Sequence, residues 1–300
     1  MGFRTRVTAL LASLLVSAGG AVSAPAATAQ EVASGTGPAL TVDEASLDRS
    51  LNCHGDLAGS DRNTVIPLHG TTANVEANWS WTWEPALAEN VTHAIRTVYA
   101  ESGRKVDLVG HSQGGMIGRW TTKWWPDTRA MVANMAGLGS SNNGSDMISL
   151  TCTVACPEAM RQQSSGSDFL TALNEGGDTF PGIRYTRIAT RFDEVVAPYD
   201  KAFLPPADNV RNIIQQDQCP GEPVEHFLLA ASNPVSELAV QALDGNPDPR
   251  VDPSACQKIM PGVDVAQIPT GLPSTVGTIV GALAGSPWTA AEPPVADFAR

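Results

Sequence analysis

The chain contains 300 residues, of which 42% are hydrophobic and 17% are charged. That length and composition fit one large globular domain with a substantial core. The formal net charge is −12, and lysine and arginine form no cluster, which argues against a nucleic-acid-binding protein. We interpret the acidic balance as favouring solubility.

The first 29 residues have the pattern of a secretory signal peptide. Arg4 and Arg6 form a basic n-region, residues 9–16 an apolar h-region, and Ala27-Thr28-Ala29 an A-x-A cleavage site. Cleavage would remove two arginines and no acidic residue, changing the net charge from −12 to −14. No other stretch reaches the roughly 18 apolar residues that a membrane-spanning helix needs. The sequence therefore predicts a secreted, extracellular protein.

Beyond the signal peptide, residues 30–50 are small and polar and are expected to form a loose lead-in to a single domain over 51–300. Apolar runs predict buried strands at 63–70, 105–111, 129–138, 183–193 and 208–217. Helical periodicity predicts helices at 86–103, 114–125 and 274–285, and the segment 225–243 is expected to start at a histidine and then become a helix. Strands separated by helices indicate the α/β class, with a mostly parallel sheet flanked by helices.

An exported protein places its cysteines in an oxidising environment, so the five cysteines are candidates for disulfides. Cys152 and Cys156 could close a small loop, and Cys219 with Cys256 a larger one. Cys53 is then left over. No CxxC pair or His/Cys cluster supports a metal site.

One motif carries chemistry. Gly110-His111-Ser112-Gln113-Gly114 fits G-x-S-x-G, between an expected strand and an expected helix. In such a turn the serine adopts a strained backbone conformation with its Oγ exposed above the sheet. Side chains in place of Gly110 and Gly114 would collide across the turn. Ser112 is thus the candidate nucleophile.

A serine nucleophile needs a base, and on this fold the base follows the serine in the chain. Of the five histidines, only His226 lies beyond Ser112. His69 is expected to brace its loop rather than to take part in catalysis. The candidate base is therefore His226.

The acid that orients the base should lie between Ser112 and His226, at the end of a strand. Asp193 ends the run "YTRIATRFD" and fits this place best. Asp107 lies in the strand before the serine and is expected to be structural. The other candidates for the acid lie in sequence contexts that fit the end of a strand less well, and they are Asp178, Asp200, Asp208 and Asp217.

Two backbone donors are expected to hold a developing oxyanion. Gln113 follows the nucleophile at the start of a helix. The second donor should come from "LHGTTAN", where Gly70 allows a tight turn and Thr71 offers its backbone N–H and its hydroxyl.

These segments together resemble the secreted α/β-hydrolase lipases similar to Candida antarctica lipase B, especially actinobacterial relatives. The similar segments are "LNCHG", "HGTTANVEANWSW", "GHSQGG", "ATRFDEVVAP", "QCPGEPVEHFLL" and "STVGTIVGALAG". The last of these is similar to a helix that the family places over the substrate mouth. The resemblance runs from about Leu51 to near the C-terminus.

The resemblance implies an α/β-hydrolase fold and a carboxylic ester hydrolase for triacylglycerols or other hydrophobic esters, with no cofactor and no metal. By that resemblance the triad is Ser112, Asp193 and His226, and the oxyanion residues are Thr71 and Gln113. It also implies a Cys219–Cys256 bridge. The expected partner is a hydrophobic ester or lipid substrate with transient contact at a lipid interface, and the expected state is a monomer.

The segment 71–104 departs from the family. Between the oxyanion turn and the elbow this fold normally has helix, strand and helix, whereas here there is one clear helix and no β-branched run. In the family that strand bears the cysteine that pairs with the one in "LNCHG", so its absence would explain why Cys53 is odd. One sheet strand is therefore expected to be deleted, by a natural deletion or an error in the gene sequence. An exposed strand edge and lower stability would follow.

Three alternatives to a triacylglycerol lipase remain open, two because they use the same triad and one because of the shortened segment. The same triad serves polyester or cutin-type esterases, and it also serves acyltransferases. The shortened segment is instead compatible with a catalytically impaired, secreted binding protein built on the hydrolase fold.

Overall fold

A computed structural model of the chain describes residues 35–71, 84–257 and 288–300. Its main sheet has five strands in the order β1-β2-β3-β5-β6, and every neighbouring pair is parallel. The strands are β1 (Thr64–Leu68), β2 (Val106–His111), β3 (Val132–Leu138), β5 (Arg184–Ala189) and β6 (Val210–Ile214). The predicted α/β class with a mostly parallel sheet is confirmed.

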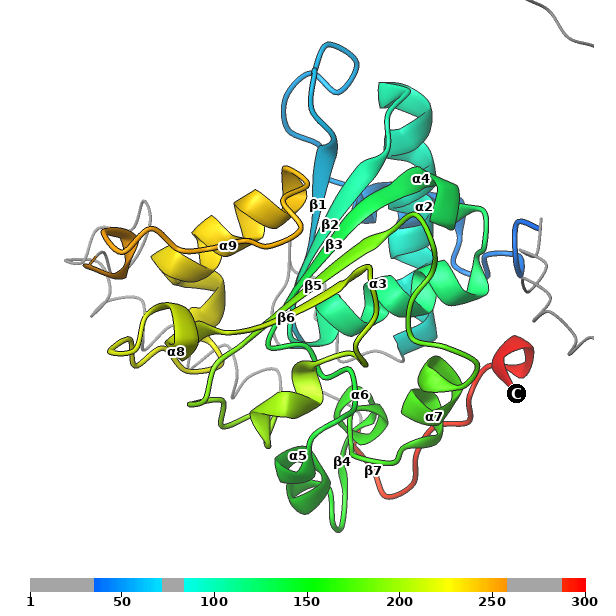
Figure 1. The fold of residues 1–300 in the computed structure, drawn as a ribbon. Coiled ribbons are helices and arrows are strands. Elements are labelled where there is room, and N and C mark those ends of the chain that lie inside the picture. Colours follow the sequence, from blue (N-terminus) through cyan, green and yellow to red (C-terminus); the bar gives the residue numbers. More distant parts are fainter. Residues whose placement is uncertain (1–34, 72–83, 258–287) are drawn as a thin grey trace, which may run out of the picture. The chain divides into compact units, whose positions relative to one another are not determined.

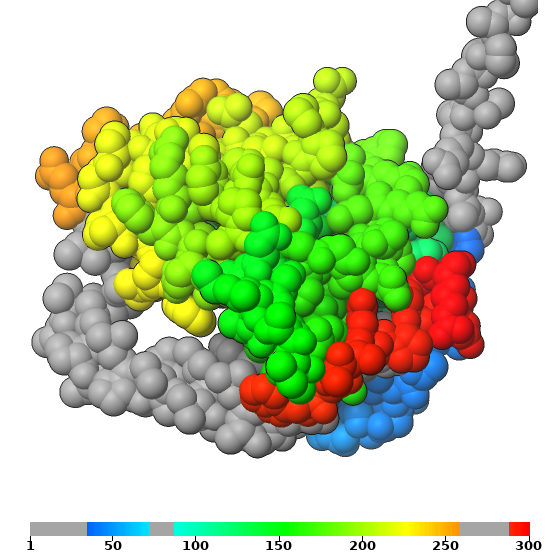
Figure 2. All heavy atoms as spheres, turned by 90° about the horizontal axis from the view of Figure 1, so that it is seen from below, coloured from blue at the N-terminus to red at the C-terminus, as the bar shows by residue number. Residues whose placement is uncertain are grey.

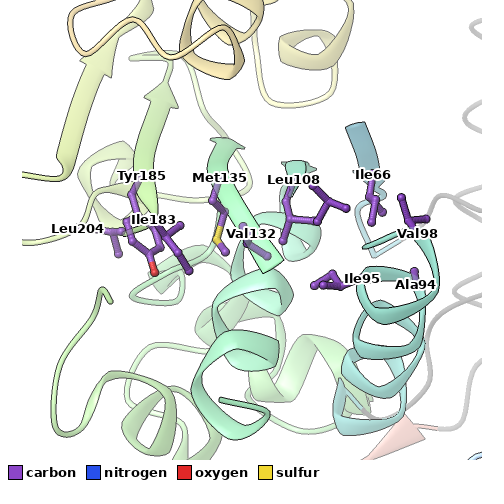
Figure 3. Close-up of a cluster of buried hydrophobic side chains, with 11 residues drawn as sticks. Ile66, Ala94, Ile95, Val98, Leu108, Val132, Met135, Ile183, Tyr185 and Leu204 are labelled. Atoms are coloured by element: carbon purple, nitrogen blue, oxygen red, sulfur yellow. The ribbon is translucent and has the colours of Figure 1, made fainter. Parts of the chain in front are cut away.

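Helices cover both faces of this sheet (Figure 1). On one face lie α2 (Glu84–Ser102) and α3 (Gln113–Trp124), and on the other lies α9 (Asn233–Leu243). Figure 3 shows the apolar layer between α2 and the strands, where Ile95 and Val98 approach Ile66 and Leu108. Leu238 of α9 belongs to the separate cluster on the opposite face. A sheet covered on both faces explains why its strands are near-continuous apolar runs.

Short elements gather beyond the carboxyl ends of the strands (Figure 1). They are α5 (Asp146–Thr151), β4 (Cys156–Pro157), α6 (Glu158–Gln162), α7 (Asp168–Asn174) and β7 (Trp288–Thr289). Figure 2, viewed from that side, shows the C-terminal segment in red along the green segment that holds these helices. The strand β7 pairs with β4, and Glu292 accepts hydrogen bonds from the backbone N–H groups of Asp168 and Phe169.

The remaining elements are short connections. They are α1 (Glu44–Ser50), α4 (Thr128–Met131), η1 (Tyr199–Ala202), α8 (Gln215–Gln218), η2 (Leu228–Ala231), η3 (Ala255–Gln257) and η5 (Asp297–Ala299), where η marks a 3₁₀ helix. None of the described helices is long and apolar enough to cross a membrane.

Several boundaries differ from those predicted. Residues 129–131 belong to α4 instead of β3, because Arg129 donates to the carbonyls of Thr122 and Lys123 and turns the chain. The strand expected over 208–217 ends at Ile214 and continues as α8. The predicted helix 274–285 lies outside the described residues.

The segment expected to be a loose lead-in contains the helix α1. Asp43 caps it by accepting from the backbone N–H of Ser46, and Leu47 is buried. Just before it, Glu89 of α2 accepts hydrogen bonds from the backbone N–H groups of Thr41 and Val42. Residues 41–50 are therefore fixed against the domain rather than loose.

Two disulfides join Cys152 to Cys156 and Cys219 to Cys256, as expected, and Cys53 is exposed and free. Among the described residues β1 forms the edge of the sheet and pairs with β2 alone. No strand is described between β1 and β2 in the sequence, although residues 72–83 lie outside the described ranges. The expected loss of a strand next to β1 therefore stays a prediction.

Candidate active site

Ser112 sits in a strained turn between β2 and α3. Its φ is +54° and its ψ −124°, and among the described residues it is the one non-glycine with positive φ. A Cβ at Gly110 would lie 2.3 Å from the backbone N of Gly115. A Cβ at Gly114 would lie 2.3 Å from the carbonyl oxygen of Leu68. Both glycines are therefore required by the close approach of the backbone, and the turn has the geometry of a nucleophile elbow.

His226 and Asp193 lie side by side in loops that follow β5 and β6. Both carboxylate oxygens of Asp193 lie 2.9 Å from Nδ1 of His226, and both residues are buried. The carboxylate is fixed further by the backbone N–H groups of Val195 and Val196, at 3.0 and 2.7 Å from Oδ1. Since a carboxylate only accepts, Nδ1 carries the proton and Nε2 is the acceptor nitrogen of the imidazole.

Backbone and side-chain contacts hold this pair against the elbow. The N–H of Ser112 donates to the carbonyl of Leu138 at 2.8 Å. The next residue, Gly139, has a φ of +54°, and a Cβ there would lie 3.1 Å from Oδ2 of Asp193 and 3.2 Å from Nδ1 of His226. The end of β3 thus contacts the elbow through Leu138 and the Asp193–His226 pair through Gly139.

His111, the residue before Ser112, contacts His226 through a hydrogen bond and through its ring. Its Nε2 donates to the carbonyl oxygen of His226 at 2.8 Å, and the two ring centroids are 4.9 Å apart. Burial, with a smaller contribution from the neighbouring His226, lowers the pKa of His111 to about 4. His111 is therefore a neutral hydrogen-bond donor at neutral pH.

The rival carboxylates lie elsewhere or have other partners. Asp178 forms an ion pair with buried Arg119, and Asp217 forms one with Arg191. Asp107 accepts from both the backbone and the side chain of Asn134, as a structural residue of β2 would. The two other rivals are Asp200, in η1, and Asp208, before β6.

The turn after β1 lies against the elbow. A Cβ at Gly70 would be 3.2 Å from Cβ of Ser112, a tight contact, so a glycine lets the turn approach the elbow without displacing its neighbours. Thr71 follows, and its Oγ1 accepts a hydrogen bond of 3.0 Å from Nε2 of Gln163. Nδ1 of His69 is hydrogen-bonded to the carbonyl of Gly70 at 2.9 Å, consistent with a bracing role.

Gln113 is the first residue of α3, and the backbone N–H groups of a first helical turn point out of its N-terminus. With the turn at Gly70 and Thr71, this helix end flanks Ser112. The arrangement suits stabilisation of negative charge beside the serine. The described residues contain no group of three or more His, Cys, Asp or Glu side chains arranged to hold a metal.

Three residues of the site were missed by sequence reasoning. His111 is visible within the motif, but its contact with His226 is not, and neither Gly139 nor Gln163 carries a local signal. All three act through contacts between segments that are distant in the chain. Only the fold reveals them.

Apolar side chains are exposed around the short helices beyond the strand ends. Leu150 of α5 is 66% exposed and Val154, in the loop closed by Cys152 and Cys156, is 83% exposed. Met147 and Trp288 are also exposed. We call these four residues the apolar rim.

A separate cleft of about 300 Å³ lies near the amino ends of β1 and β2. Its lining includes Arg62, Val65 and Val240. Because these strands are parallel and Ser112 lies at their carboxyl ends, this cleft is remote from the candidate site.

Proteins similar to this chain include lipases. The family model described as lipase (class 2) matches residues 88–210. Lipase B of Pseudozyma antarctica is 26% identical over 217 residues, which cover 62% of this chain and 63% of that protein. The chain therefore spans less than two thirds of the length of this relative.

The crystal structure of Aspergillus fumigatus lipase B superposes with a TM-score of 0.76 at 24% sequence identity. The match covers 88% of this chain and 74% of that one. The chain thus has the α/β-hydrolase fold and is similar to the lipase B proteins, as its motifs predicted.

Proposed function

We propose that this chain is a serine hydrolase that cleaves carboxylic esters, with triacylglycerols as its substrate class. The observation that carries the proposal is the strained Ser112, next to His111, which is hydrogen-bonded to a buried His226 whose Nδ1 is bonded to Asp193. The similarity to lipase B supports a lipid ester as the substrate.

In the proposed reaction, Oγ of Ser112 attacks the ester carbonyl while Nε2 of His226 takes its proton. The negative charge on the carbonyl oxygen is held by the backbone N–H groups of Thr71 and Gln113 and by the Thr71 hydroxyl. His226 then gives the proton to the leaving alcohol, and an acyl-enzyme remains.

Water attacks this acyl-enzyme, and His226 takes one proton from the water and returns it to Oγ of Ser112, which releases the carboxylic acid. Asp193 keeps the imidazole in the required tautomer and orientation throughout. In this proposed reaction every proton is transferred by His226.

We also propose that the protein is exported and works at a lipid surface. The signal-peptide pattern of residues 1–29 and the two disulfides support export. The apolar rim, beyond the same strand ends as Ser112, supports transient contact with an interface.

The decisive experiment is labelling of the purified protein with a fluorophosphonate probe, together with hydrolysis of short- and long-chain triglycerides. We expect labelling and hydrolysis by the wild type, and the loss of both in Ser112→Ala. A folded wild-type protein that is neither labelled nor active would refute the proposal and favour the binding-protein alternative. If the probe labels the protein but triglycerides are not hydrolysed, Ser112 stands as the nucleophile and triacylglycerols are ruled out as the substrate class.

A further inference from the structure

Gln163, the C-cap residue that follows α6, is buried in contact with the oxyanion turn. It is 1% exposed, and its side-chain amide forms three hydrogen bonds. Its Nε2 lies 2.9 Å from the carbonyl oxygen of Ala159 and 3.0 Å from Oγ1 of Thr71, and its Oε1 lies 2.8 Å from Oγ of Ser141. Every polar atom of this amide is therefore engaged.

These partners fix which way the amide points. The carbonyl of Ala159 can only accept, so the amide atom beside it must be the NH₂ group. Oε1 then faces Ser141, whose hydroxyl donates to it. The other amide hydrogen donates to Thr71.

The direction of the Thr71 hydroxyl follows from this chain of donors. An amide nitrogen cannot accept, so Oγ1 of Thr71 is the acceptor toward Gln163 and its own hydrogen must point elsewhere. The adjacent Gly70 packs against Ser112, with 3.2 Å between its ideal Cβ position and Cβ of the serine. The hydroxyl hydrogen of Thr71 is therefore available to an acceptor other than Gln163, and the proposed function supplies one in the carbonyl oxygen of an ester bound at Ser112.

We propose that Gln163 is a positioning residue for the oxyanion site, where it orients the Thr71 hydroxyl so that it donates to the substrate oxygen. This inference rests on the proposed function and deepens it. Gln163 itself touches no reacting atom. Its effect is to hold Thr71 in a donor state before the substrate arrives, which avoids reorganisation as the oxyanion forms.

The test is a double-mutant cycle with Gln163→Met and Thr71→Val, measured as kcat and KM on p-nitrophenyl butyrate. The methionine keeps the length of the side chain without its polar atoms, and the valine keeps the shape of threonine without the hydroxyl. We expect Gln163→Met alone to lower kcat about 10-fold, a fraction of the 10²- to 10³-fold cost of removing a whole donor. KM should change less than about twofold, because the lost interaction is made only in the transition state.

In the Thr71→Val background, Gln163→Met should change kcat less than about twofold, because no hydroxyl is left to orient. Gln162→Met, at the neighbouring buried glutamine, is the matched control for loss of a buried amide and should leave kcat unchanged. Melting temperatures of all variants identify any that fail to fold.

An equal loss of kcat from Gln163→Met in both backgrounds would overturn the positioning role and leave the proposed function standing. A folded wild type that is neither labelled by fluorophosphonate nor active would overturn both together. The two failures are therefore distinguishable.

Discussion

Gly139 directly follows β3 and lies against both Asp193 and His226. Its φ of +54° disfavours a side chain, and a Cβ there would press on Asp193, His226 and, at 2.9 Å, Cδ1 of Leu229. We predict that Gly139→Ala lowers kcat/KM for p-nitrophenyl butyrate about 100-fold or more, because small displacements of catalytic groups have effects of that order.

The control for Gly139→Ala is Gly103→Ala. Gly103 has a similar φ of +65°, but a Cβ there would meet nothing within 4 Å. Both variants carry a backbone strain of roughly 1–2 kcal/mol, so both should melt at lower temperature. Only Gly139→Ala should lose activity, and equal activity in the two variants would contradict this account of the site.

His111 makes the stability of the protein dependent on pH. Its pKa is about 4 in the folded protein because of burial, against an ordinary value of 6.5, and the titratable groups that face it are His226 and Asp193. In the unfolded chain His111 therefore binds a proton as the pH falls through about 6.5, whereas in the folded chain it does so only near pH 4. The free energy of unfolding should fall as the pH drops from 6.5 to 4, with His111 contributing about 3 kcal/mol to this fall.

Urea unfolding of the wild type and of His111→Gln at several pH values measures this contribution. Glutamine retains an N–H donor for the carbonyl of His226 but does not titrate. The stability difference between the two proteins should change by about 3 kcal/mol in favour of the glutamine variant between pH 7 and pH 4. A difference that stays constant over this range would rule out His111 as the source.

At the scale of elements, local patterns predicted the strands and helices but not where they end. The run 183–193 looks like one strand, yet β5 stops at Ala189. There Thr190 donates to the carbonyl of Val224 and accepts from Gln216, which draws the chain into the loop that carries Asp193. These partners are distant in sequence, so no window of neighbouring residues contains the boundary.

The candidate site likewise combines residues that local sequence patterns predict with residues that they do not. Ser112 could be predicted because its motif demands glycines at fixed offsets, and His226 because only one histidine follows the serine. Gln163 could not be predicted, because its role depends on the hydrogen-bonding partner Thr71, 92 residues away. Local chemistry in the sequence thus identifies the reacting groups, and tertiary contacts determine the residues that support them.

The edge strand β1 leads to a prediction about stability. Among the described strands it pairs with β2 alone, and Val65 is 44% exposed. Insertion of about 20 residues from a related lipase into 71–104, enough for a crossover and a strand, should cover this edge and give Cys53 a partner. We expect the melting temperature to rise roughly 5–15 °C, since a disulfide alone contributes about 2–4 kcal/mol.

The same insertion with its cysteine changed to serine separates the effect of covering the β1 edge from the effect of the disulfide to Cys53. We expect this variant to keep part of the rise, because the strand still satisfies the exposed N–H and C=O groups of β1. If neither insertion raises the melting temperature, β1 is not a source of instability in this protein.

At the scale of the whole molecule, apolar exposure and net charge together determine which surface the protein should bind. The apolar rim groups Leu150, Val154, Met147 and Trp288 beyond the strand ends that carry Ser112. The chain as a whole is acidic, with a net charge of −12. We therefore predict binding to neutral phosphatidylcholine vesicles and triolein droplets, and weaker binding to anionic vesicles that salt strengthens by screening the repulsion.

The double variant Leu150→Ser/Val154→Ser should bind neutral vesicles about 10-fold more weakly, since each side chain contributes part of the ~1.5–3 kcal/mol gained by full burial. Its hydrolysis of soluble p-nitrophenyl acetate should be unchanged, because neither residue contacts the triad. Val240→Ser, at a residue that is 54% exposed and lines the cleft near the amino ends of β1 and β2, is the control and should bind like the wild type. Equal weakening by both changes would mean that general hydrophobicity, rather than an oriented rim, governs contact with lipid.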